Sequence, residues 1–192
     1  MKKFLITSLL LILCSIATMA QDESTSAVEN ATIEEQTSLY MATRGYRGTA
    51  EVSPLTVSIG GLAFKFGTTH GFQFNHKLFL GGGVGVIKYY NNDEIDIPVY
   101  IAIQSNVGKN MAQFTYGGRL GISVYSKHYF LDVNNQPTTT VSEGPGPLYF
   151  NFNLGLRLGF TPQYAMTIKP ELEVIYCGYP LANLGLNLGF EF

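Results

Sequence analysis

Residues 148–160 read LYFNFNLGLRLGF, and their alternation decides the fold. Every even position from Leu148 to Phe160 carries a large apolar side chain, whereas the odd positions carry Tyr, Asn, Gly or Arg. Successive side chains of a β-strand point to opposite faces, while a helix repeats every 3.6 residues, so only a strand places these apolar residues on one face. Residues 182–192, ANLGLNLGFEF, repeat the pattern. Both segments are predicted to be strands.

Similar segments precede and separate these two. The alternation predicts eight strands in all, at 47–59, 62–74, 77–90, 97–108, 111–125, 148–160, 165–176 and 182–192. Pro54 predicts an edge, a bulge or a frame shift in the first of them. The expected connections alternate between short turns, at 75–76, 109–110 and 161–164, and longer polar links, at 91–96, 126–147 and 177–180. Short turns at one end and longer loops at the other are typical of a membrane barrel.

The glycines distinguish a membrane barrel from a soluble one, since strands alternate in both. Many glycines share the face opposite the Leu and Phe rows, among them Gly67, Gly81, Gly117, Gly155 and Gly189. Eight strands enclose a space just wide enough for side chains, so small residues are needed inside and bulky apolar ones project outward. A soluble barrel would bury the Phe and Leu side chains and expose the glycines. The pattern therefore favours a barrel in a membrane.

Charged residues also belong to the predicted inner face. They are Lys65, Arg119, Arg157, Lys169, Glu171, Glu173 and Glu191, with Glu51 a possible further acid. Buried charges are tolerated when they are paired and hydrogen-bonded. The near balance of signs predicts an ion-pair network that fills the lumen, the space inside the barrel. The alternative is that some of these charges lie at the rims.

The N-terminal residues have the features of an export signal. Lys2 and Lys3 precede an apolar run over 4–16, and small residues at 17–20 suit cleavage near Ala20. We expect a signal peptide at 1–20, a polar periplasmic tail at 21–44 and the barrel at 45–192. Without the signal, ten basic residues oppose fourteen acidic ones, a balance that excludes nucleic acid as a partner.

With these features the sequence resembles the small outer-membrane β-barrel proteins, the group that includes the transmembrane domain of OmpA and the OmpX-type barrels. The resemblance covers residues 45–192. The last strand, with Leu188, Phe190 and Phe192, looks like the signal that the β-barrel assembly machinery reads. The segment TTHGFQFN at 68–75 and the glycines of 81–85 are also similar to barrels of this type.

The resemblance implies an all-β, eight-stranded, antiparallel, up-and-down transmembrane β-barrel in the outer membrane of a Gram-negative bacterium. It also implies that outer-membrane lipid and lipopolysaccharide surround the protein, that the assembly machinery inserts it, and that it is a monomer.

Two groups of residues in the predicted external loops carry side chains of the types that bind metal ions or catalyse reactions. Residues 91–96 (NNDEID) carry oxygen ligands that suit Ca²⁺, although a solvated loop is the favoured interpretation. Ser126, His128 and Asp132 are the groups that acyl transfer requires, but nearness within a loop does not make a triad. We expect no catalytic residue, cofactor or metal.

The expected function is therefore a structural or interaction role, through external loops and mainly through 126–147, with the lumen filled rather than open. A small porin or channel is the first alternative. A lipid-modifying outer-membrane enzyme is the second.

Overall fold

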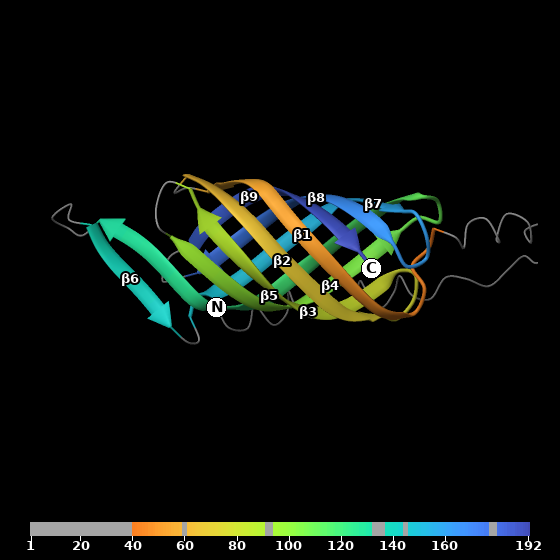
Figure 1. The fold of residues 1–192 in the computed structure, drawn as a ribbon, viewed down its shortest axis with the longest axis horizontal. Coiled ribbons are helices and arrows are strands. Elements are labelled where there is room, and N and C mark those ends of the chain that lie inside the picture. The colour runs from red at the N-terminus through yellow and green to blue at the C-terminus, as the bar shows by residue number, and fades with distance from the viewer. Residues whose placement is uncertain (1–39, 59–60, 91–93, 132–136, 144–145, 177–179) are drawn as a thin grey trace, which may run out of the picture. The chain divides into compact units, whose positions relative to one another are not determined.

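The computed structural model describes residues 40–58, 61–90, 94–131, 137–143, 146–176 and 180–192. Nine antiparallel strands are formed there (Figure 1). They are β1 (Gly45–Ser58), β2 (Gly61–Gln73), β3 (Leu78–Tyr89), β4 (Ile95–Val107), β5 (Ala112–Leu131), β6 (Pro137–Glu143), β7 (Leu148–Gly159), β8 (Ala165–Tyr176) and β9 (Pro180–Glu191). No helix in these residues is long and apolar enough to cross a membrane.

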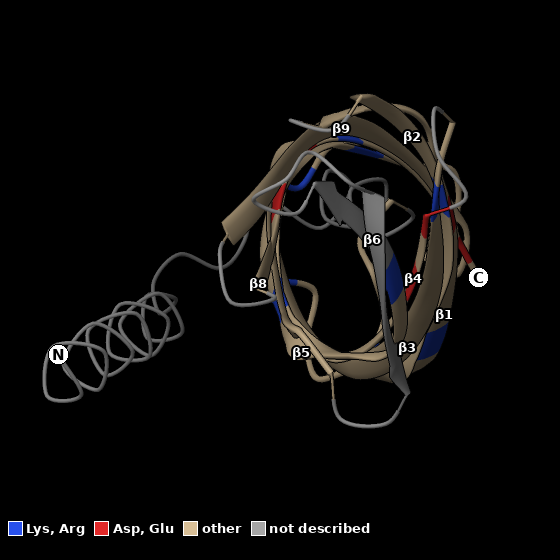
Figure 2. Ribbon diagram, turned by 90° about the vertical axis from the view of Figure 1, so that its left-hand side faces the viewer, with Lys and Arg blue, Asp and Glu red and all other residues tan. Residues whose placement is uncertain are grey.

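Eight of the strands close into a barrel. Each strand pairs with its neighbours in chain order, except that β5 pairs with β7, and the first and last strands, β1 and β9, pair with each other. The view along the axis shows the ring of strands, with charged positions on several of them (Figure 2). The predicted all-β, eight-stranded, antiparallel barrel is confirmed.

The two faces of the wall have the predicted orientation. In β7, Phe150, Phe152 and Leu156 are exposed outside the barrel, whereas Tyr149 and Asn151 are buried inside it. The last strand behaves in the same way, with the apolar side chains from Leu184 to Phe192 exposed on the outer face. Apolar side chains therefore cover the outside, and polar ones line the lumen.

The first strand contains a bulge at Pro54. Its pairing with β2 shifts between Ser53 and Thr56, and its pairing with β9 shifts between Val52 and Leu55. Both Ser53 and Thr56 are therefore buried in the lumen. A proline donates no backbone hydrogen bond, and a bulge is one of the few places where a strand tolerates it. The frame of the inner face therefore changes from odd to even positions within β1.

The predicted loop over 126–147 is wrong in its interior. Strand β5 continues to Leu131, and β6 pairs with it from Tyr125↔Glu143 to Leu131↔Pro137. Figure 1 shows this hairpin extending beyond the other strands. Residues 126–143 carry no regular alternation of apolar and polar residues, so the period-two signal used for prediction is missing there.

The predicted signal at 1–20, and residues 21–39 of the predicted tail, lie outside the described residues. The end of the tail, residues 40–44, contacts the barrel at the rim where β1 begins and β9 ends. Ala42 is buried, and the Tyr40 carbonyl accepts hydrogen bonds from Gln113 Nε2 at 3.1 Å and from Arg157 Nη1 at 3.0 Å. This rim also carries the short turns, so we call it the turn rim. The opposite rim, which carries the hairpin, is called the hairpin rim.

Candidate functional site

The lumen collects most of the charged side chains of the described strands. Five cations and six acids are buried: Arg47, Lys65, Arg119, Arg157, Lys169, Glu51, Glu94, Asp96, Glu171, Glu173 and Glu191. Strand alternation places all of them except Glu94, which directly precedes β4, because they occupy inward positions of strands whose outward positions are apolar. An isolated buried charge is very costly, so the arrangement depends on how well these groups pair.

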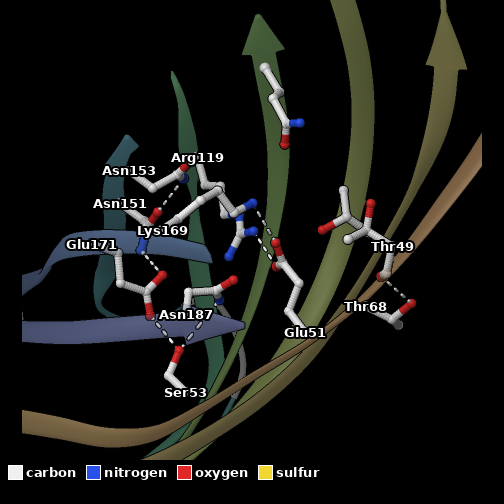
Figure 3. A network of polar contacts seen from close by, with 12 residues as sticks. Thr49, Glu51, Ser53, Thr68, Arg119, Asn151, Asn153, Lys169, Glu171 and Asn187 are labelled. Carbon is white, nitrogen blue, oxygen red and sulfur yellow. Dashed lines mark hydrogen bonds and ion pairs between the residues drawn. The ribbon is translucent and has the colours of Figure 1, made fainter. Parts of the chain in front are cut away.

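Glu51 of β1 is shared by two cations in the middle of the lumen. Its carboxylate pairs with the Arg119 guanidinium of β5, and its Oε1 accepts a hydrogen bond from Lys169 Nζ of β8 at 2.8 Å. Figure 3 shows Glu51 and Arg119 facing each other across this part of the lumen. One acid therefore links β1, β5 and β8, three strands that do not pair with one another in the barrel.

Lys65 of β2 is the reverse case, one cation between two acids of β8. Its Nζ lies 2.7 Å from Glu171 Oε1 and 2.9 Å from Glu173 Oε2. Neutral side chains also donate hydrogen bonds to both carboxylates. Ser53 and Asn151 donate to Glu171, and Tyr149 and Asn183 donate to Glu173.

Glu191 of β9 forms a third cluster near the turn rim. Its Oε2 accepts hydrogen bonds from Arg47 Nη1 at 2.7 Å and from Arg157 Nε at 2.8 Å, and its Oε1 accepts one from Gln104 at 3.2 Å. Arg157 also donates to Gln113 and to the Tyr40 carbonyl. This cluster ties five strands (β1, β4, β5, β7 and β9) and the N-terminal segment together.

Aromatic rings and glycines fill the remaining volume. Tyr100 stacks on Tyr149 with ring centroids 5.6 Å apart, and the Arg119 guanidinium lies 5.0 Å from the centre of the Tyr100 ring. A Cβ on Gly83 would lie 2.6 Å from the Tyr100 ring, so glycine is needed there. One cavity between Glu51, Arg119 and Asn153 has a volume of about 10 Å³, about what one water molecule requires.

All seven residues that the sequence placed in the lumen network lie there and are buried. Three further buried charged residues were missed: Arg47, Glu94 and Asp96. Arg47 has the same parity as Glu51 along β1, a signal that was present in the sequence. Asp96 was assigned to an external loop, but β4 begins at Ile95 and buries Asp96, which accepts hydrogen bonds from Tyr89 and Ser123.

The other candidate groups do not form a site in the described residues. No set of three metal-ligating side chains gathers there, and residues 91–93 lie outside the description. Ser126 is buried, and its hydroxyl has no hydrogen-bond partner among the described atoms. The backbone of His128 pairs with Thr140, its side chain is outside the described part, and so is Asp132.

The outer face carries aromatic contacts near the turn rim. Phe72 lies against Phe74, and Phe114 against Tyr116; Tyr164, Phe190 and Phe192 form a stacked series. In the predicted assembly signal, Leu188, Phe190 and Phe192 all point outward. Backbone hydrogen bonds join Phe192 to Gly48 in both directions, at 2.7 and 2.9 Å, which closes the β1–β9 seam.

Comparison with known proteins gives structural matches only. No family model and no curated protein matches the chain. Neisserial surface protein A, from Neisseria, matches with a TM-score of 0.56 and 12% identity over 76% of this chain and 94% of its own. The N-terminal β-barrel domain of Pseudomonas aeruginosa OprF gives 0.49 and 12%, over 79% and 99% of the two chains. Ail of Yersinia pestis gives 0.45 and 14%, over 79% and 100%.

The match to Neisserial surface protein A agrees with the closed barrel described above. The chain has the fold of the small eight-stranded outer-membrane barrels.

Proposed function

We propose that this chain is an integral outer-membrane protein with a filled lumen, which acts through the hairpin of β5 and β6 as a structural or interaction protein. The observation that carries the proposal is the inverted distribution of side chains. Bulky apolar residues are exposed around the barrel, while ion pairs are buried within it. In water this surface would be a very large apolar patch, but in a bilayer it is the favourable face.

The contents of the lumen support a plug rather than a pore. Cross-lumen contacts occur at three levels, around Glu173, Glu51 and Glu191. Eight strands leave little room beyond side chains, and open channels require more strands. We therefore propose that no ions pass through the barrel and that neither rim carries a catalytic centre.

The hairpin supports the interaction role. Strand β5 has 20 residues, whereas β7, its partner in the barrel, has 12, so β5 extends well beyond the barrel. Among the described strands, β6 pairs with β5 alone. Its other edge pairs with no described strand, and such an edge is a surface to which an extended segment of a partner can bind.

Export through a cleaved signal at 1–20, insertion by the assembly machinery and existence as a monomer belong to the same proposal. So does contact with lipopolysaccharide. The turn rim would then face the periplasm, and the hairpin rim would face the outside.

Membrane fractionation with a heat-modifiability gel tests the proposal. We expect the protein in the outer-membrane fraction, with the unboiled sample migrating faster than the boiled one because a folded barrel resists unfolding by detergent. Recovery as a soluble protein without detergent would overturn it. Planar-bilayer recording should show no discrete conductance, and a defined single-channel step would overturn the filled lumen.

Surface labelling tests the orientation. In a Cys177→Ser background, Thr139→Cys in β6 should react with a membrane-impermeant maleimide on intact cells. Gln163→Cys, in the turn between β7 and β8, should react only after the cells are lysed. The reverse pattern would contradict the assigned orientation. Replacing His128 with Ala should leave lipid A and phospholipid profiles unchanged, and an altered profile would favour the enzyme alternative.

A further inference from the structure

A polar cluster interrupts the apolar outer wall near the turn rim. The outward row of β2 reads Leu62, Phe64, Phe66, Thr68, His70 and Phe72, so Thr68 and His70 are its two polar members. Tyr46 of β1 lies beside His70, with its phenol oxygen 2.5 Å from His70 Nδ1 and its ring stacked on the imidazole. The other ring nitrogen, Nε2, lies 2.8 Å from the Thr68 hydroxyl.

The hydrogen bonds define which atoms the cluster offers to a ligand. The Thr68 hydroxyl donates to the Thr49 carbonyl at 3.2 Å, so its oxygen accepts from His70 Nε2–H. With Nε2 as the ring donor, Nδ1 accepts the proton of the Tyr46 hydroxyl. The phenol oxygen retains its lone pairs, and Tyr46 is 68% exposed. The cluster therefore presents a hydrogen-bond acceptor on an aromatic ring, which suits a cationic donor.

Arg44 supplies the opposite charge next to this acceptor. Arg44 is exposed, and its guanidinium lies 5.9 Å from the centre of the Phe72 ring. Phe72 lies opposite Tyr46 in the pairing of β1 with β2. Within the described part of the chain, no acid pairs with Arg44. An exposed guanidinium of this kind binds phosphate oxygens well.

On one side of the cluster, the neighbour of His70 has no side chain over it. His70 pairs with Gly48 in β1 and with Gly82 in β3. The Phe192 ring fills the space over Gly48, where an added Cβ would lie 2.6 Å from it, whereas over Gly82 the nearest atom is a backbone oxygen at 3.5 Å. No side chain therefore covers the outer face at Gly82, beside His70 and on the side away from Tyr46.

The depth of the cluster matches a lipid headgroup. His70 lies three residues before the end of β2, and on a strand tilted by about 45° this places it about 7 Å from the strand end. That level is where the headgroups of a bilayer meet its hydrocarbon core. A headgroup with a phosphate and an adjacent primary ammonium would suit both the Arg44 guanidinium and the Tyr46 phenol oxygen.

We infer that Arg44, Tyr46 and His70 form a binding site for phosphatidylethanolamine in the leaflet at the turn rim. The phosphate binds the Arg44 guanidinium, the ammonium donates to the Tyr46 phenol oxygen, and His70 positions that phenol. The space over Gly82 accommodates the start of an acyl chain. The inference rests on the proposed function, because only a membrane barrel has lipid at this rim.

Native mass spectrometry of the full barrel, released from micelles with equimolar phosphatidylethanolamine, phosphatidylcholine and phosphatidylglycerol, tests the site. Phosphatidylcholine has no N–H to donate, and phosphatidylglycerol has no ammonium. We expect the first retained lipid to be phosphatidylethanolamine, about tenfold over phosphatidylcholine, as one charge-assisted hydrogen bond allows. Equal retention of the three lipids would overturn the inference.

Matched variants locate the binding. Tyr46→Phe keeps the ring but loses the acceptor, so the preference for phosphatidylethanolamine should disappear, whereas Tyr164→Phe, at an exposed tyrosine of the same rim, should preserve it. Arg44→Gln should reduce retention of all three lipids, and Lys109→Gln at the same rim should not. An equal effect of Tyr46→Phe and Tyr164→Phe would overturn the site.

Two further measurements separate the possible failures. Soluble phosphoethanolamine should not displace the lipid at millimolar concentration; displacement would identify a site for a soluble ligand and overturn the lipid assignment. Heat-modifiability is measured on every variant. A barrel that shows the gel shift but no lipid preference refutes the lipid site alone, whereas a chain without the gel shift refutes the proposed function.

Discussion

The inner and outer walls of this barrel are made by the same strands, and Gly117 and Gly118 of β5 show how differently the two walls respond to change. A Cβ on Gly117, which faces the lumen, would lie 2.6 Å from the backbone oxygen of Ile103. A Cβ on Gly118, which faces outward, would meet its nearest atom at 3.6 Å. The inner wall is limited by space and by charge pairing. At Gly118 the outer wall is limited by the need to stay apolar rather than by space.

Removing a shared acid from the lumen should have the largest effect. Glu51→Gln leaves Arg119 and Lys169 buried without their acid, and breaking a buried ion pair in this way costs about 3–5 kcal/mol. Urea unfolding in lipid vesicles should show the loss. Lys109→Gln, at an exposed cation of the turn rim, is the control and should leave the unfolding midpoint unchanged. An unchanged midpoint for Glu51→Gln would show that the network contributes little to stability.

A charge on the outer wall should have the next largest effect. Phe152 is exposed in the middle of β7, and an arginine at the level of the bilayer centre destabilises a barrel by about 2–4 kcal/mol. The same vesicle titration measures Phe152→Arg, with Phe152→Leu as the apolar control. If Phe152→Arg were instead neutral and more soluble without detergent, the outer wall would face water.

The glycine pair gives a smaller and more selective effect. Gly117→Ala forces a methyl group against backbone that cannot move away, and overpacking of this kind costs about 1–3 kcal/mol. Gly118→Ala should stay within about 0.5 kcal/mol of the parent, as surface changes usually do. Gly117→Ala should therefore have a lower free energy of unfolding than Gly118→Ala. Equal values would mean that the two faces of β5 are packed alike.

Deleting the hairpin should have the smallest effect on the wall. Among the described strands, β6 pairs with β5 alone, beyond the barrel. Replacing residues 128–142 with a short Gly-Ser link should therefore change the free energy of unfolding by about 0.5 kcal/mol or less. The gel shift on boiling should persist. Loss of the shift would show that the hairpin is part of the folded barrel rather than an appendage on it.

Sequence patterns were most informative where one face is apolar and the other polar. The eight barrel strands and the inward position of Lys65, Arg157 and Glu191 follow from alternation alone. The pattern failed at Asp96, because a polar residue at a strand start looks like part of the preceding loop. It also failed in the hairpin, where the sequence carries no period-two alternation of apolar and polar residues.

Alternation along a strand is a local property, so the sequence alone determined that there are eight barrel strands and which side chains share a face. The partners within the lumen are not local. Glu51 meets Arg119, 68 residues away, and Lys65 meets Glu173, 108 residues away. Closure of the barrel, with its tilt and stagger, decides which inward rows come level with each other. Only the tertiary structure therefore shows which acid neutralises which cation, and that the Tyr40 carbonyl joins the cluster around Glu191.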